Sequence, residues 1–232
     1  MPSLEIPPTR LEIAVTSLTD AVNAAAGGAD SVEISRDLSV GGLTPALDLV
    51  AAARDAIRIP IYVLVRDHAR DFVYTPAEMD AMLATVRQLQ GIGVQGVVFG
   101  ALTASGEMDL DAMQAMVRAA GPMSVTLHRA LDACRNPQVA LSRLTGIIPR
   151  VLTAGPAPTA WEGRTAVAAW VAQFGSQMEF VSSGGLTAAQ LPAFIRQVRP
   201  SVVHLGGAAR SGDSVVIEKV QNVKQIIHLV DL

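Results

Sequence analysis

Residues 61–92 read IYVLVRDHARDFVYTPAEMDAMLATVRQLQGI and contain one complete unit of a strand followed by a helix. The β-branched run Ile61–Val65 is typical of a short buried strand. The tetrapeptide Thr75-Pro76-Ala77-Glu78 has the pattern of a capping box with proline at the first helical position, which predicts where the helix begins. Apolar side chains then recur at helical spacing from Met79 to Leu89, which predicts one buried helix face.

The same alternation of a short apolar run and a helical segment occurs eight times along the chain. We expect strands at Leu11–Val15, Ser31–Ile34, Ile61–Val65, Gly96–Phe99, Ser124–Leu127, Arg150–Leu152, Glu179–Ser182 and Val202–Leu205. Repeated units of this kind build a parallel sheet, and eight of them in 232 residues leave no room for a second domain. Closure of the sheet removes both of its edges. We therefore predict an α/β fold, a TIM-type (β/α)8 barrel that residues 1–232 form as a single domain.

Composition excludes several classes of function. The net charge is −3, and lysine and arginine form no cluster of the kind that a nucleic-acid backbone requires. No stretch of about 18 apolar residues and no leader pattern is present. We expect no nucleic-acid partner, no membrane partner and a cytoplasmic location. Cys134 is the only cysteine, which excludes an intrachain disulfide and a site of several thiolates.

Polar side chains gather where the expected strands end, which is where TIM barrels carry their active sites. Alternation along the first two strands predicts that both glutamates there point into the barrel. A buried carboxylate is costly unless it is paired, so we expect these glutamates to have cationic partners, with arginine and histidine at the other strand ends as candidates. The candidate catalytic residues are Glu12, Glu33, Arg66, His128, Arg129 and Asp132.

These residues allow two interpretations. One is a buried ion network with a structural role only. The other is a site in which Glu12, Glu33 or His128 exchanges a proton with a substrate while Arg66 or Arg129 holds its anionic group. The second interpretation predicts that Glu12, Glu33, Arg66 and His128 meet in one cavity.

Two glycine turns follow the last two expected strands, in Ser182-Ser183-Gly184-Gly185 and Leu205-Gly206-Gly207. Loops at these positions of a TIM barrel often bind phosphate, because glycine lets backbone N–H groups approach an anion. Glycine pairs are also simply tight connections. As candidate binding residues for a small anionic ligand, such as a phosphorylated metabolite, we name Ser182, Gly184, Gly185, Gly206 and Gly207.

Seven segments, in this order along the chain, resemble the CutC family: GGADSVE (27–33), GGLTP (41–45), DFVY (71–74), VVFGALT (97–103), HRALD (128–132), RVLTAG (150–155) and APTAWEG (157–163). The resemblance extends from about residue 11 to about residue 207. It implies a TIM-type barrel, a cytoplasmic location, a homo-oligomer and a role in copper homeostasis. It also implies that the pocket residues are Glu12, Glu33, Arg66, Asp71, His128, Arg129 and Asp132.

The chain departs from the family at the proposed copper ligands, which are cysteines at the ends of the first two strands. Ala14 and Ser35 stand at these positions. Alanine cannot bind a metal and a neutral hydroxyl is a poor ligand for Cu(I), so we do not carry copper binding over and assign no metal ligands. A second departure is the loop Asp67-His68-Ala69-Arg70, which is rich in glycine in the family. Two functions stay open: a CutC-like role in copper homeostasis, and an enzyme or binder for a small anionic metabolite.

Overall fold

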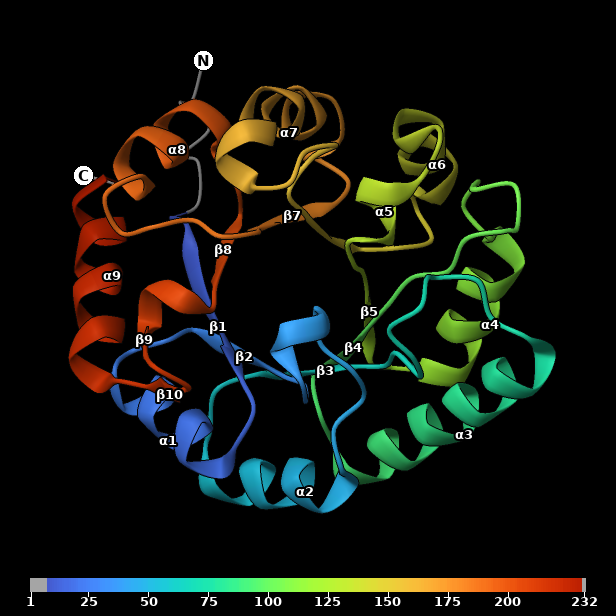
Figure 1. The fold of residues 1–232 in the computed structure, drawn as a ribbon, viewed down its shortest axis with the longest axis horizontal. Coiled ribbons are helices and arrows are strands. Elements are labelled where there is room, and N and C mark those ends of the chain that lie inside the picture. Colours follow the sequence, from blue (N-terminus) through green and yellow to red (C-terminus); the bar gives the residue numbers. More distant parts are fainter. Residues whose placement is uncertain (1–7, 231–232) are drawn as a thin grey trace.

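The computed structural model describes residues 8–230 and shows a closed barrel of eight parallel strands (Figure 1). Each strand pairs with its neighbours in the chain, and β1 closes the barrel against β8. The TIM-type barrel prediction is confirmed, and no strand differs from its predicted range by more than one residue at either end. The strands are β1 (Arg10–Val15), β2 (Ser31–Ile34), β3 (Ile61–Leu64), β4 (Gly96–Phe99), β5 (Ser124–Leu127), β6 (Arg150–Thr153), β7 (Glu179–Ser183) and β8 (Val202–Leu205).

Helices surround the barrel on the outside, as Figure 1 shows. The main hydrophobic core lies between them and the outward faces of the strands. The helices are α1 (Leu18–Ala26), α2 (Leu47–Ala56), α3 (Pro76–Ile92), α4 (Leu110–Ala120), α5 (Ala130–Ala133), α6 (Pro137–Leu144), α7 (Ala160–Phe174), α8 (Leu191–Val198) and α9 (Ile217–Val230).

Helix α3 shows how the sequence pattern produces this layer. The Thr75 hydroxyl accepts a hydrogen bond from the Glu78 N–H, and the Glu78 carboxylate accepts one from the Thr75 N–H. The predicted capping box is therefore confirmed. Met82, Val86 and Leu89 form the buried face of the helix, at the spacing that the sequence indicates.

The barrel interior contains apolar and charged regions side by side. Two small apolar clusters lie apart from the main core. One consists of Tyr62, Leu64 and Val98, and the other of Leu152, Val181 and Val202. Charged side chains from β1, β2, β6 and β8 are also buried in the barrel. In a mostly apolar interior, the electrostatic interactions between these charged groups are stronger than they would be in water.

Short elements frame the mouth of the barrel at the carboxyl ends of the strands. They are the 3-10 turns η1 (Leu38–Val40) and η2 (Gly207–Ala209) and the hairpin of β9 (Arg210–Ser211) with β10 (Ser214–Val215). The buried Arg210 fixes this hairpin, because its guanidinium donates to the Ala14 carbonyl at 2.6 Å and to the Asp20 carboxylate at 2.9 Å. The loop after β8 is thereby tied to the end of β1.

A test of the packing between α7 and the barrel is Gly163→Ala. A Cβ at Gly163 would clash with the backbone carbonyl of Ala154, which cannot move like the end of a flexible side chain. We expect the free energy of unfolding to fall by about 3 kcal/mol, measured by urea denaturation. The matched control is Gly91→Ala in α3, where no atom lies within 4 Å, and alanine should raise stability by about 0.5–1 kcal/mol. Equal effects of the two substitutions would contradict the packing.

Candidate functional site

A cavity of about 1230 Å³ opens at the carboxyl ends of the barrel strands. Nine of the eleven predicted site residues line it: Glu33, Arg66, His128, Arg129, Asp132, Gly184, Gly185, Gly206 and Gly207. Glu12 and Ser182 do not. Ser183 lines the cavity in place of Ser182, because neighbouring residues on a strand point to opposite faces. The prediction that Glu12, Glu33, Arg66 and His128 meet in one cavity holds for the last three and is wrong for Glu12, which does not line the cavity.

Glu12 is fully buried and is held by three side chains. Its Oε2 accepts hydrogen bonds from Arg150 at 2.7 Å and from the Ser31 hydroxyl at 2.8 Å, and its Oε1 lies 3.0 Å from His204 Nδ1. Burial would raise the pKa of Glu12, but the charge of Arg150 and the hydrogen bond with His204 outweigh it and lower the pKa to about 2. Glu12 is therefore an ionised anchor in the barrel interior.

Arg66, one of the candidate cationic partners of the buried glutamates, does not pair with either of them. The Arg66 guanidinium donates to the backbone carbonyls of Val40 at 3.0 Å and Gly42 at 3.2 Å, and it lies 4.9 Å from the centre of the Phe72 ring. Arg66 follows β3 at the cavity wall, and its side chain contacts the loop that carries η1. It fixes that loop beside the cavity, and Arg150 is the cation that pairs with Glu12.

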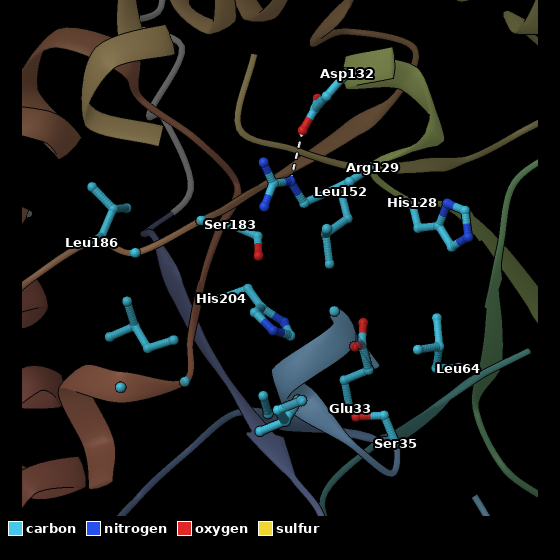
Figure 2. A pocket seen from close by; sticks show the side chains of 18 of the residues that line it. Glu33, Ser35, Leu64, His128, Arg129, Asp132, Leu152, Ser183, Leu186 and His204 are labelled. Atoms are coloured by element: carbon cyan, nitrogen blue, oxygen red, sulfur yellow. Dashed lines mark hydrogen bonds and ion pairs between the residues drawn. The ribbon is translucent and has the colours of Figure 1, made fainter. Parts of the chain in front are cut away.

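Glu33 and His204 face one another at the cavity floor, as Figure 2 shows. Glu33 Oε2 is buried without a hydrogen-bond partner among residues 8–230. Burial and the charge of Glu12 raise the pKa of Glu33. Burial would lower the pKa of His204, but the charge of Glu33 and the hydrogen bond with Glu12 outweigh it and raise the pKa. Each of these two side chains therefore holds a proton more readily than an isolated residue of its type.

His128 is a neutral hydrogen-bond donor on the cavity wall. Its Nδ1 accepts from the Ala130 N–H at 3.1 Å, which places the ring proton on Nε2, and Nε2 has no partner within the described chain. Burial and the charge of Arg66 lower the pKa of His128 to about 3. The ring fits here because a Cβ at Gly100 would lie only 2.6 Å from Nδ1. The geometry favours donation to a ligand oxygen over exchange of a proton.

Arg129 and Asp132 form a brace at the cavity rim. Arg129 Nε donates to Asp132 at 2.8 Å, the contact that is dashed in Figure 2. Asp132 also accepts hydrogen bonds from the Thr153 hydroxyl and, at 3.0 Å, from the Ala154 N–H. Burial raises the pKa of Asp132 despite these contacts. The pair joins the end of β5 to the end of β6, while the Arg129 side chain stays 40% exposed.

The glycine turns after β7 and β8 line the cavity. Figure 2 shows Ser183 and Leu186, which flank the first of these turns, on the side opposite His128. Gly184 and Gly185 have φ values of +123° and +72°, which other residues rarely adopt. The backbone N–H groups of Gly185 and Gly207 have no hydrogen-bond partner among the described residues. These donors are the groups that could receive an anion.

Two residues that organise the site, Arg150 and His204, are not among the candidate site residues predicted from the sequence. Arg150 begins β6, at the opposite end of the strand from the predicted site residues, and its long side chain reaches Glu12 across the barrel interior. Strand alternation contained the signal, because Arg150 shares a face with Leu152, and an arginine that points into a barrel requires a carboxylate. His204 lies at the end of β8, where polar side chains indicate a site, but it is not among the predicted site residues.

The fold and the cavity define a TIM-barrel protein with an open polar site at the carboxyl ends of its strands. The sequence profile of the CutC family matches residues 9–209, and the chain belongs to this family. A CutC family protein of Xanthomonas campestris pv. campestris strain 8004 is 41% identical over 184 residues, which are 79% of this chain and 77% of that protein. A CutC family protein of Mesorhizobium japonicum is 40% identical over 195 residues, 84% of this chain and 76% of the relative.

A solved structure from Streptococcus agalactiae, described there as a candidate copper homeostasis protein CutC, has the same fold. The two structures superpose with a TM-score of 0.80 and are 22% identical in sequence. The match covers 85% of this chain and 98% of the chain from Streptococcus agalactiae. None of the helices within residues 8–230 has the length and apolar character required to cross a bilayer.

Copper is the metal that the name of the solved relative suggests, and we tested its fit to the cavity. No cysteine or methionine is among the described residues that line it. Ala14 and Ser35, at the positions of the family's proposed cysteine ligands, do line it. Cys134 is buried in the main core and does not reach the cavity. Cu(I) prefers sulfur ligands, so this donor set does not fit it.

The ion pair between Glu12 and Arg150 can be tested by a double-mutant cycle. We expect Arg150→Met to lower the free energy of unfolding by about 3–5 kcal/mol, because it leaves the buried Glu12 carboxylate without its cation. Glu12→Gln should then cost less in the Arg150→Met background than in the wild type. Arg66→Met is the control, because it leaves no carboxylate unpaired, and it should cost less than Arg150→Met. A coupling energy near zero in urea denaturation would contradict the pairing.

The pKa of His128 predicts an acid-dependent loss of stability. Between about pH 6.5 and pH 3 the unfolded chain binds a proton at this residue that the folded chain does not bind. The free energy of unfolding therefore falls as the pH is lowered through this window. We expect His128→Gln to show a smaller loss between pH 6.5 and pH 4 in urea denaturation, and His228→Gln, at an exposed position, to match the wild type. Identical pH profiles for all three proteins would show that His128 titrates normally.

Proposed function

We propose that this protein binds a small anionic organic metabolite in the cavity at the carboxyl ends of its strands. The observation that carries the proposal is the set of unpartnered polar groups around one open cavity. They are the N–H of His128 Nε2, the backbone N–H groups of Gly185 and Gly207, and the Glu33 carboxylate. Buried polar groups normally have partners, so groups without one point to a ligand.

The anionic group would lie against the glycine turns. Gly185 and Gly207 offer donors there without a side chain to keep an anion away. Arg129 adds positive charge at the rim, although Asp132 offsets part of it. Apolar residues such as Leu64, Val98 and Leu152 line other parts of the cavity and favour a ligand with an apolar portion.

The remaining polar groups would meet the reacting part of the ligand. His128 would donate a hydrogen bond to a ligand oxygen such as a carbonyl. Glu33 and His204, which line the cavity floor and both have raised pKa values, would supply the groups for acid–base chemistry. The assembly into a homo-oligomer and the cytoplasmic location, both implied by the family resemblance, stay predictions.

A titration with inorganic phosphate tests the anion site. We expect phosphate to shift the backbone amide NMR signals of Gly184, Gly185, Gly206 and Gly207 in the full chain. The backbone at Gly207 is not in the left-handed region, and no atom of the described chain lies within 4 Å of a Cβ there, so valine should be tolerated. Its side chain would occupy space beside the backbone N–H at the cavity, and Gly207→Val should therefore weaken phosphate binding about 10-fold or more. The control Gly91→Ala should bind like the wild type. The proposal fails if phosphate shifts none of these signals, or shifts them equally in Gly207→Val.

A role in copper homeostasis is the second candidate, and membership of the CutC family favours it. Because the cavity lacks sulfur ligands, we propose that any such role does not use Cu(I) bound in this cavity. A competition titration with a Cu(I) chelator measures this directly. Cu(I) affinity that falls in Glu33→Gln or His204→Gln, but not in Cys134→Ser, would contradict the proposal.

A further inference from the structure

Of the carboxylates that the structure describes inside the barrel, Glu12 and Glu179 pair with arginine and Glu33 does not. Arg150 contacts two carboxylates, Glu12 at 2.7 Å and Glu179 at 2.8 Å, and Glu179 also pairs with Arg10. This leaves Glu33, which is 7% exposed and whose Oε2 has no partner within the described chain. A carboxylate buried in this way calls for a cation or a proton.

The surroundings of Glu33 resemble a metal site in their geometry. One carboxylate oxygen of Glu12, one of Glu33 and one ring nitrogen of His204 all lie within 4.8 Å of one another. Ligand atoms of a single ion are about 2.1 Å from it and hence at most about 4.2 Å apart, so the spacing in this cluster is within about 1 Å of that of a metal site.

The hydrogen bond that His204 donates to Glu12 decides which nitrogen of His204 would bind a metal ion. Glu12 Oε1 lies 3.0 Å from Nδ1, which leaves Nε2 as the ligand atom. In Figure 2 the His204 ring points from β8 toward the Glu33 carboxylate. A metal-binding histidine whose other nitrogen donates to a carboxylate is the common arrangement, because the carboxylate fixes the ring and its tautomer.

We propose that Glu33 and His204 bind a divalent transition-metal ion at the cavity floor, with Glu12 as the positioning residue of His204. Carboxylate oxygen and imidazole nitrogen suit Zn²⁺ or Mn²⁺, whereas Cu(I) requires softer ligands. The other coordination positions of the ion face the cavity and are open to water or to a ligand.

This inference deepens the proposed function, since the ion adds positive charge where an anionic ligand would lie. Metal binding requires the Glu33 carboxylate and Nε2 of His204 in their deprotonated forms, so protons that they hold are released to solvent. Metal binding is measured without any organic ligand or phosphate. A failure here would therefore leave the anion site untouched, and a failure of phosphate binding would leave the metal site untouched.

The experiment is an isothermal titration of chelator-treated full-length protein with Zn²⁺ and, separately, with Mn²⁺. We expect one ion per chain, with affinity that rises with pH as the ligands lose protons. Glu33→Gln and His204→Gln should each weaken binding by about 100-fold or more. Cys134→Ser and His228→Gln, which remove the only thiol and an exposed imidazole, should bind like the wild type. Circular dichroism and thermal melts confirm that each variant is folded.

A spectroscopic readout does not depend on the variants. Electron spin echo measurements on the Mn²⁺-loaded wild type should show modulation from one imidazole nitrogen. The proposal is overturned if folded wild-type protein binds neither ion below millimolar concentration, or if either cluster variant binds like the wild type. Loss of binding in Cys134→Ser or His228→Gln, or Mn²⁺ without nitrogen modulation, would equally overturn it.

Discussion

The ion pair of Glu12 and Arg150 joins the first and sixth strands through the barrel interior, and the polar site depends on it. Two full charges are buried there, and Ser31, His204 and Glu179 complete their contacts. Removal of either charge would leave the other buried and unpaired, which is far more costly than loss of a surface ion pair. The pair thus holds the side chains beneath the cavity in place. Through its hydrogen bond with His204, Glu12 also orients the His204 ring toward Glu33.

Because Arg150 is committed to Glu12 and Glu179, Glu33 is left in the cavity without a cation of its own. The other arginines are also engaged. Arg66 fastens the loop after β2 through backbone carbonyls, and Arg129 pairs with Asp132. The cavity therefore has several hydrogen-bonding groups without a partner in the part of the chain that the structure describes, whereas the guanidinium groups of Arg66 and Arg129 already make hydrogen bonds within the protein. An anionic ligand would therefore be bound by glycine N–H groups and by the His128 donor, and Glu33 would be neutralised by a bound cation.

Much of the fold could be predicted from the sequence, because alternation and helix caps are local signals. Thr75 and Glu78 marked the start of α3, and β-branched runs marked the strands. The sequence predicts which residues lie near the site but not which of them form hydrogen bonds and ion pairs. Strand ends indicate where a residue lies, but not how far its side chain extends. The candidate partners of the buried glutamates included Arg66 and not Arg150, because Arg150 lies at the start of its strand and only its long side chain reaches Glu12. Ser182 was named where Ser183 lines the cavity, an error of one residue that reverses the face.

The central claim is that two neighbouring buried glutamates differ, with Glu12 held as an ionised anchor and Glu33 left free to take a proton or a cation. A ¹³C NMR titration of the glutamate side-chain carboxyl carbons in metal-free protein measures this difference directly. The account predicts that Glu12 titrates near pH 2, because Arg150 and His204 outweigh the effect of its burial, and that Glu33 titrates above its ordinary value. Two glutamates with the same ordinary pKa, or a pKa of Glu33 below that of Glu12, would contradict it.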